Sequence, residues 1–116
     1  MCSCDGDGPS AFWESRPKAK QRHKCCECSG WIEPGETYWR VRGIWDGESR
    51  TYKMCADCDA LLSWCGDDAD CFCWSFQCVH QDVVDYVGES GDTALIAEAD
   101  ARIRAIRDKR RERVAA

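Results

Sequence analysis

Two short stretches, "HKCCECSGW" at residues 23–31 and "MCADC" at residues 54–58, each contain a Cys-x-x-Cys unit. The cysteines of the two units are Cys25, Cys28, Cys55 and Cys58. Zinc prefers four soft ligands at the corners of a tetrahedron, and two Cys-x-x-Cys units supply two of its edges. The sequence therefore predicts one Zn²⁺ site with these four thiolates as ligands.

The chain has 11 cysteines in 116 residues, which either bind metal or form disulfides. The cellular compartment decides between these two explanations. The N-terminal segment lacks the apolar core of a signal peptide, and no stretch is apolar enough to span a bilayer. These features predict a cytoplasmic protein without membrane association, in which thiols stay reduced and bind metal. A disulfide framework and a rubredoxin-like iron site are the alternatives. We discount iron because Cys58 leads into the helical pattern "DALLSW" rather than a Gly-rich loop.

The residues between and after the two units predict a β-hairpin followed by a helix. Residues 37–45 alternate and are rich in β-branched and aromatic residues, and residues 49–55 form the predicted return strand. Asp46-Gly47 between them is a strong hairpin-turn signal. The alternation places Trp39 and Val41 on one face and Tyr38, Arg40 and Arg42 on the other. Residues 1–11 are expected to be irregular, and residues 11–24 form a basic lead-in.

The order of knuckle, hairpin and helix N-terminus resembles a treble clef zinc finger, so we expect a small zinc-bound α+β domain. A second helix follows a cysteine-aromatic run and is predicted to end at Gly88, with Asp92 as the N-cap of a long last helix. We place a zinc-binding domain at residues 1–90 and a C-terminal helix with a basic tail at residues 91–116. An apolar stripe follows the last helix at Leu95, Ala99, Ile103 and Ile106. This stripe fits either the core or the seam of a homodimer.

The remaining cysteines include two Cys-x-Cys pairs, and each pair can chelate one metal ion if the backbone bends. The pairs are Cys2 with Cys4 and Cys71 with Cys73. We predict that they form a second zinc site that ties the N-terminus to the acidic C-terminal half, with Cys26 as a substitute ligand. The alternative is that the later cysteines, Cys65 and Cys78 included, are small core hydrophobes.

Charge is segregated along the chain, whose net charge is −5. From Met54 to Ala101 there are acidic residues and no Lys or Arg, whereas bases gather in residues 16–24 and 102–113. The candidates for binding nucleic acid or an acidic partner are Arg16, Lys18, Lys20, Arg22, Lys24, Arg107, Arg110 and Arg111. The alternative is that the basic ends lie against the acidic middle of the chain.

The sequence contains no combination of nucleophile and base that is typical of an enzyme. It has only two histidines, His23 and His80, no catalytic serine motif, and no His-x-Glu of the zinc deaminases. A zinc ion with four thiolates is closed to water and structural. We therefore expect a protein that is not an enzyme. Five of its six tryptophans either fill the core or supply an anchor for a partner: Trp31, Trp39, Trp45, Trp64 and Trp74.

The stretch "RHKCCECSGWIEPGETYWRVRGIWDGESRTYKMCADC" resembles a group of small zinc-finger-like proteins of bacteriophages and prophages. The matching elements are Cys2 and Cys4, then His23–Cys28, Pro34–Tyr38, Gly43–Gly47, Cys55–Cys58 and Cys71–Trp74. The resemblance covers roughly residues 1–76, and it implies that both Cys-x-Cys pairs accompany the first zinc site. It also implies a phage-encoded protein in the cytoplasm of the host cell.

Two functions follow as expectations. The favoured one is a non-catalytic zinc-binding module that binds and modulates a host protein. The reasons are a rigid scaffold held by metal, many tryptophans, an acidic face and the lack of a set of catalytic residues. The alternative is a nucleic-acid-binding zinc-finger regulator that uses residues 16–24 and 102–113, with the hairpin bases Arg40, Arg42, Arg50 and Lys53 adding to that surface.

Overall fold

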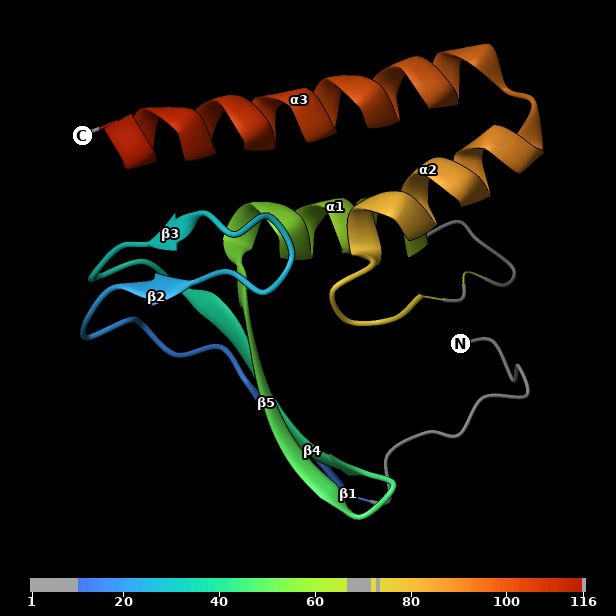
Figure 1. Ribbon diagram of the computed structural model, residues 1–116. Helices are drawn as coiled ribbons and strands as arrows, with labels where there is room; N and C mark the ends of the chain where they lie inside the picture. The colour runs from blue at the N-terminus through green and yellow to red at the C-terminus, as the bar shows by residue number, and fades with distance from the viewer. Residues whose placement is uncertain (1–10, 67–71, 73, 116) are drawn as a thin grey trace.

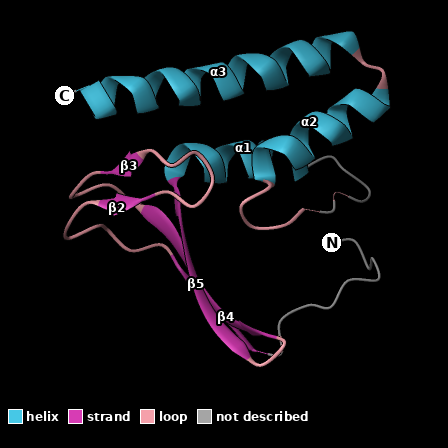
Figure 2. Ribbon diagram, viewed as in Figure 1, coloured by secondary structure: helices cyan, strands magenta, loops and turns pink. Residues whose placement is uncertain are grey.

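The computed structural model describes residues 11–66, 72 and 74–115, in which strands come first and helices follow (Figures 1 and 2). The strands are β1 (Ala11–Ser15), β2 (His23–Lys24), β3 (Trp31–Ile32), β4 (Tyr38–Trp45) and β5 (Glu48–Cys55). The helices are α1 (Ala56–Gly66), α2 (Val79–Ser90) and α3 (Thr93–Ala115). The predicted α+β class is confirmed, with a hairpin, a helix directly after it and two further helices. None of the described helices combines the length and apolar character that a membrane span requires.

The hairpin of β4 and β5 forms as the sequence predicts. The two strands are antiparallel, and their register runs from Tyr38 opposite Cys55 to Trp45 opposite Glu48. Asp46 and Gly47 both have positive φ, at 51° and 80°. This is the backbone of a type I′ turn, whose twist matches the twist of the flanking strands, and Asp-Gly is among the sequences that tolerate it.

Strand β1 corrects the expectation that residues 11–24 are only a basic lead-in to the first Cys-x-x-Cys unit. It pairs with β4 in antiparallel register, from Ala11 opposite Ile44 to Ser15 opposite Arg40, and completes a sheet of order β1-β4-β5. Most of its side chains are exposed, so it lacks the apolar alternation by which a strand is recognised in sequence. Its pairing with a distant strand, rather than its composition, makes it a strand.

The helices bury their apolar faces against one another in a single core cluster. Helix α3 lies across α1 and α2 (Figure 1), and α2 and α3 are joined by a tight turn. Its Ala99, Ile103 and Ile106 are 1%, 4% and 7% exposed. The apolar stripe of the last helix is therefore part of the core of this chain, and in this arrangement it is not a free seam for a second copy.

The end of α2 differs from the prediction. The sequence predicts Gly88 as its C-cap, but Gly88 lies within the helix, and Gly91 is the residue in the left-handed conformation, with φ 70°. The N–H of Gly91 donates to the carbonyl of Gly88 at 3.3 Å. Asp92 caps α3 as predicted, because its Oδ1 accepts hydrogen bonds from the N–H groups of Ala94 and Leu95 at 3.0 and 3.2 Å.

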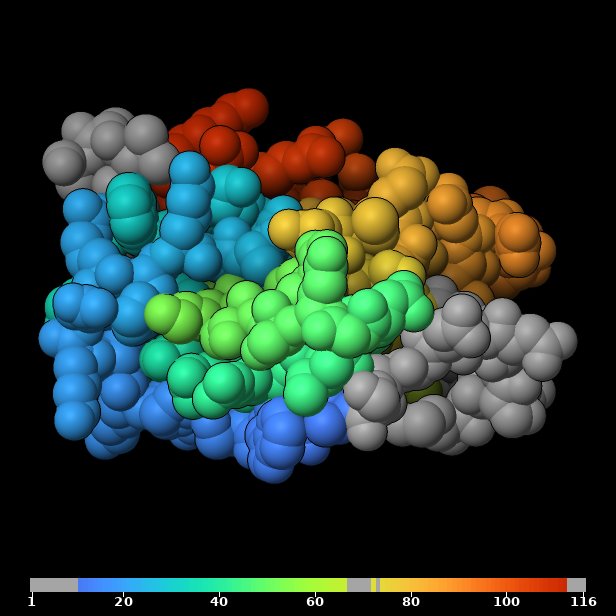
Figure 3. Space-filling view, turned by 60° about the horizontal axis from the view of Figure 1, so that its bottom comes forward, coloured from blue at the N-terminus to red at the C-terminus, as the bar shows by residue number. Residues whose placement is uncertain are grey.

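Aromatic rings fill the space between the sheet and the segment that leads into α2. Phe76 stacks on Tyr52 of β5 at a centroid distance of 4.3 Å and also contacts Trp39 and Trp74. Figure 3 shows the hairpin of β4 and β5 in green between the N-terminal strand in blue and the yellow segment that precedes α2. Four of the six tryptophans belong to the core or pack against it, and they are Trp39, Trp45, Trp64 and Trp74. Trp13 on β1 is 57% exposed.

Candidate metal centre

The sulfur atoms of the two Cys-x-x-Cys units converge at one point. The Sγ atoms of Cys25, Cys28, Cys55 and Cys58 all lie within 4.8 Å of one another. Cys25 and Cys58 are 3.8 Å apart, as are Cys28 and Cys55. A zinc ion with Zn–S distances of about 2.3 Å holds its four sulfurs about 3.8 Å apart at the corners of a tetrahedron. The four predicted ligands are therefore close enough to hold one metal ion, and their spacing is compatible with zinc.

The first pair of ligands comes from the tight turn between β2 and β3, at residues 25–30, which we call the knuckle. The N–H of Ser29 donates to the carbonyl of Cys25 at 3.1 Å, and the N–H of Cys25 donates to the carbonyl of Gly30 at 2.9 Å. Ser29 adopts a positive φ of 60°. These bonds reverse the chain over a few residues, so Cys25 and Cys28 turn their thiols to the same side.

The second pair comes from the junction of β5 and α1. Cys55 is the last residue of β5, and Cys58 lies in the first turn of α1. The N–H of Cys26 donates to the carbonyl of Lys53 at 2.8 Å, which fixes the knuckle against the end of β5. The sheet, the knuckle and the helix N-terminus thus meet at the point where the four thiols converge.

Backbone N–H groups point at the sulfurs from the knuckle and from β5. The N–H groups of Glu27 and Cys55 lie 3.4 and 3.3 Å from Cys25 Sγ, and the N–H of Gly30 lies 3.3 Å from Cys28 Sγ. Such donors stabilise the negative charge of thiolates and thereby favour metal binding. The cluster is arranged to hold ionised sulfur rather than neutral thiols.

Hydrogen bonds among the four sulfurs change the pKa values of the thiols in opposite directions. The pKa of Cys25 is lowered by its hydrogen bonds with the side chains of Cys28, Cys55 and Cys58 and with the backbone N–H of Cys55. The pKa of Cys58 is raised, chiefly because its thiol is hydrogen-bonded to the Cys25 sulfur. The pKa of Cys28 is lowered as well, so the protein alone favours ionisation of only part of the cluster. A bound dication supplies the charge that keeps all four sulfurs ionised.

The site is closed on its protein side. Cys58 and Cys25 are 0% and 2% exposed, and Cys28 and Cys55 are half-buried. Four protein ligands occupy every position of a tetrahedral ion, so no position is open for water or substrate. A metal ion held here acts on the fold rather than on a bound molecule.

His80 of α2 contacts the centre without belonging to the four-sulfur group. Its Nε2 lies 3.3 Å from Cys58 Sγ, and the ring is half-buried. Burial, with a smaller contribution from the positive charge of Arg107, lowers the pKa of His80. His23 lies away from the centre, with its Nδ1 accepting a 3.2 Å hydrogen bond from Lys53 Nζ. The neutral ring of His80 therefore joins α2 to the ligand Cys58.

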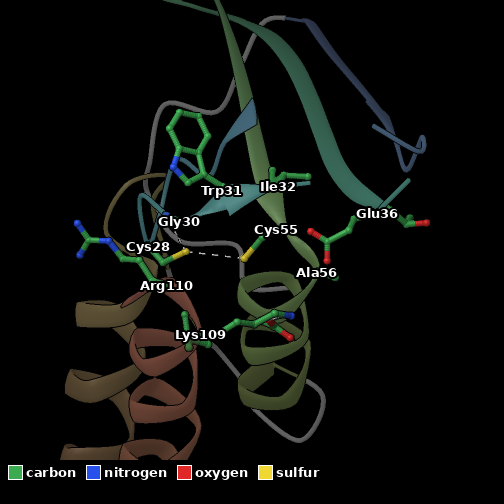
Figure 4. A pocket seen from close by; sticks show the side chains of 12 residues that line it. Cys28, Gly30, Trp31, Ile32, Glu36, Cys55, Ala56, Lys109 and Arg110 are labelled. Carbon is green, nitrogen blue, oxygen red and sulfur yellow. Dashed lines mark hydrogen bonds and ion pairs between the residues drawn. The ribbon is translucent and has the colours of Figure 1, made fainter. Parts of the chain in front are cut away.

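Bases from the end of α3 lie beside the thiols (Figure 4). Lys109 and Arg110 line the same small pocket as Cys28 and Cys55, and Lys109 Nζ is 2.8 Å from Asp57 Oδ2. A zinc ion with four thiolates has two formal negative charges in excess. Lys109 and Arg110 bring positive charge to the same side of the molecule as the thiols, although Lys109 is itself paired with Asp57.

The other cysteines separate into two groups. Cys26 is half-buried with its Sγ 3.2 Å from Glu27 Oε2, and burial and then the Glu27 carboxylate raise its pKa, so it stays a thiol outside the four-sulfur group. Cys65 is buried in α1, and Cys78 is exposed before α2. The predicted second site at Cys2, Cys4, Cys71 and Cys73 lies outside the described residues and stays a prediction.

The predicted basic candidates do not form one free surface. Arg16 pairs with Asp59 at 3.1 Å, and Arg22 pairs with Glu33 at 3.0 Å and lies over the Trp31 ring. Arg110 packs its stem against Gly30. The side chains of the remaining candidates are exposed, and they are Lys18, Lys20, Lys24, Arg107 and Arg111. The alternative that the basic ends lie against the acidic middle of the chain agrees with two pairs, Arg16 with Asp59 and Lys109 with Asp57.

The sequence does not single out Glu27, although it joins the knuckle to α2. Its carboxylate accepts hydrogen bonds from the backbone N–H groups of Gln77 and Val79, at 2.5 and 3.0 Å. Only its position between two ligand cysteines hints at such a role. The exposed Trp13 is also missed, because its strand lacks a recognisable pattern.

Comparisons with protein-family models, with curated proteins and with solved structures found no match for this chain. The case for a metal centre accordingly rests on the four cysteines themselves. Their spacing, burial and backbone donors are compatible with a small zinc-binding domain.

Proposed function

We propose that this chain is a non-catalytic binding module held together by one zinc ion at Cys25, Cys28, Cys55 and Cys58, built in the manner of a treble clef zinc finger. The observation that carries the proposal is the convergence of four thiols within 4.8 Å. A knuckle, a hairpin and a helix N-terminus supply them, which is the order of elements in a treble clef. A closed four-thiolate site stabilises a fold and leaves recognition to the surface.

The small core makes the metal important for folding. The two strands that flank the knuckle are short, since β2 and β3 have two residues each. Strand pairs of this length are not stable alone, and zinc-binding free energy becomes folding free energy in such domains. The host-protein partner predicted from the sequence remains a prediction, whereas the exposed Trp13 beside Arg40 and Arg42 favours a nucleic-acid partner.

Metal content and folding together test this proposal. Elemental analysis of the full chain should find zinc, and Cys58→Ser should contain one zinc per chain less than the wild type. Cys78→Ser is the matched control, since Cys78 is exposed and outside the four-sulfur group, and its zinc content should equal that of the wild type. Chelation should remove the circular dichroism signal of the native fold.

Cobalt substitution tests the geometry. Reconstitution with Co²⁺ should give the visible absorption bands of a tetrahedral thiolate site, and Cys58→Ser should weaken them. Equal zinc content in the wild type and Cys58→Ser would contradict the proposal. Strong visible bands in the purified protein with no zinc would assign the centre to iron.

A further inference from the structure

One face of the β1-β4-β5 sheet is turned away from the core. Successive side chains of a strand point to opposite faces, and residues paired across strands share a face. Arg42 lies opposite Trp13 of β1 and Thr51 of β5, and Arg40 lies opposite Lys53 of β5. We call this set the outer sheet face: Trp13, Arg40, Arg42, Thr51 and Lys53. The other face carries Val41 and Met54, both 0% exposed, and packs on the core.

Like charges are brought together on the outer sheet face. Arg40 and Lys53 are directly paired across β4 and β5, with Arg42 two residues along β4. Like charges directly opposite each other in a sheet destabilise it. Within the part of the chain that the structure describes, neither Arg40 nor Arg42 has an ion-pair partner. The face thus carries an energetic penalty that a bound anion would relieve.

The carboxylates of this sheet are engaged elsewhere. Glu14 of β1 lies 3.8 Å from Arg16, and Glu48 of β5 lies 3.0 Å from Arg50. By the strand alternation, Glu14 belongs to the opposite face, although part of it lines the rim of the hollow beside Trp13. The described acidic residues between Met54 and Ala101 lie on α1, α2 and α3 and at Asp92 between the last two helices. The outer sheet face is therefore locally positive in a protein whose net charge is −5, and local charge decides which ligand approaches.

Two open hollows join into a track across this face. One, of about 530 Å³, is lined by Trp13, Arg40 and Arg42 among others. The second, of about 490 Å³, is lined by Lys24, Arg40 and Lys53 together with His23. Because Arg40 belongs to both, the hollows adjoin and form a positively charged path from Trp13 to Lys24.

Trp13 gives this path an aromatic end. It is 57% exposed, whereas the other exposed large hydrophobic side chains among the described residues, Phe12, Val84 and Ile96, are 37% to 46% exposed. An exposed indole beside cations is free to stack on a flat ligand that also carries negative charge. The bases of single-stranded nucleic acid present such a surface, whereas the bases of a duplex are already stacked on each other.

We propose that the outer sheet face binds single-stranded nucleic acid, with Arg40, Arg42 and Lys53 along the phosphates and Trp13 stacked on a base. This inference rests on the proposed zinc-held fold, because β5 runs directly into the ligand Cys55. A positively charged groove with an aromatic platform is the general means of binding single strands without sequence preference. An acidic peptide would satisfy the cations but would leave the indole unstacked.

Fluorescence polarisation with the zinc-loaded full chain tests the proposal. The probe is a labelled oligo-dT of about 12 nucleotides, within the range of known single-strand site sizes. The wild type should bind it in low salt and bind a duplex of equal length more weakly. Trp13→Ala should lower the affinity about 5- to 100-fold through loss of stacking. Arg42→Ala should reduce the slope of log affinity against log salt concentration by about 1.

Two matched controls show whether a loss of binding is specific to the outer sheet face or follows from any loss of an exposed side chain. Arg50→Ala removes an exposed base of the same hairpin that is already paired with Glu48, and Ile96→Ala removes an exposed hydrophobic side chain on α3. Both should bind as the wild type does. Equal losses in Arg50→Ala and Arg42→Ala would overturn the proposal, as would binding that Trp13→Ala leaves unchanged.

The outcomes also separate this inference from the proposed function. A wild-type chain that contains zinc and is folded, yet fails to bind the oligonucleotide in low salt, overturns the inference alone. A chain without metal at the four cysteines overturns the proposed function. Poly-glutamate is the competitor that tests for an acidic protein partner. If it displaces oligo-dT fully, and if Trp13→Ala does not change the affinity, the nucleic-acid assignment is overturned in favour of such a partner.

Discussion

The carboxylate of Glu27, which lies in the knuckle, accepts a 3.0 Å hydrogen bond from the backbone N–H of Val79, the first residue of α2. The N–H of Gln77 donates to the same carboxylate. The nominal N-cap of α2, Cys78, makes no side-chain cap bond, so Glu27 takes that role from 52 residues away in the chain. The metal ligands and α2 are thereby joined by one side chain, and a negative charge lies at the helix N-terminus, where the macrodipole favours it.

The first prediction concerns this link. Glu27→Gln should lower the free energy of unfolding by about 1–2 kcal/mol, because a charged acceptor of two N–H donors becomes a neutral one. Chemical denaturation of the zinc-loaded chain measures it. Glu89→Gln, at an exposed position of α2, should change stability by less than about 0.5 kcal/mol. Equal stability of the two variants would show that Glu27 is not a cap.

A second prediction distinguishes two glycines of the α2 C-terminus. Gly91→Ala should destabilise the protein by about 1 kcal/mol or more, because φ 70° strains any residue with a Cβ. Gly88→Ala should stabilise it by up to about 1 kcal/mol, because the position is helical and a Cβ there meets nothing within 4 Å. Thermal denaturation of both variants gives the two signs. If Gly88→Ala were the less stable of the two variants, Gly88 rather than Gly91 would be the C-cap of α2.

A third prediction tests whether α3 belongs to the core. Ile103→Ala should cost about 2–4 kcal/mol, since Ile103 is 4% exposed between the helices. Ile96→Ala removes the same atoms from a side chain that is 37% exposed, and its cost should stay below about 0.5 kcal/mol. The two variants share a helix, so propensity cancels between them. Similar denaturation midpoints for both would mean that α3 does not pack as described.

A fourth prediction concerns the start of α3. Asp92→Ala should destabilise the protein by about 1 kcal/mol, because the N–H groups of Ala94 and Leu95 lose their acceptor. Asp92→Asn keeps a side-chain oxygen at the N-cap and should retain most of the stability. Urea denaturation of the pair separates the hydrogen bond from the charge. If asparagine is as damaging as alanine, the charge at the helix N-terminus is the main contribution.

Local signals made much of this protein predictable. The four ligand cysteines, the Asp-Gly hairpin and the Asp92 cap depend on residues close together in the chain, where spacing and backbone preference determine structure directly. Alternation in residues 37–45 likewise placed Arg40 and Arg42 on one face. The same reasoning failed at Gly88, because α2 continues one turn beyond its apolar stripe.

The sequence by itself determined the ligand set and the order of knuckle, hairpin and helix, because the spacing of the cysteines predicts a metal site of this kind directly. Only the tertiary structure decided the rest. Strand β1 exists because β4 offers it a partner, Glu27 caps a helix far along the chain, and the stripe of α3 is covered by α1 and α2. Each of these features depends on contacts between residues far apart in the chain. A local sequence pattern does not predict the free energy of such contacts. The same packing leaves Arg40, Arg42 and Trp13 on a face that the core does not use.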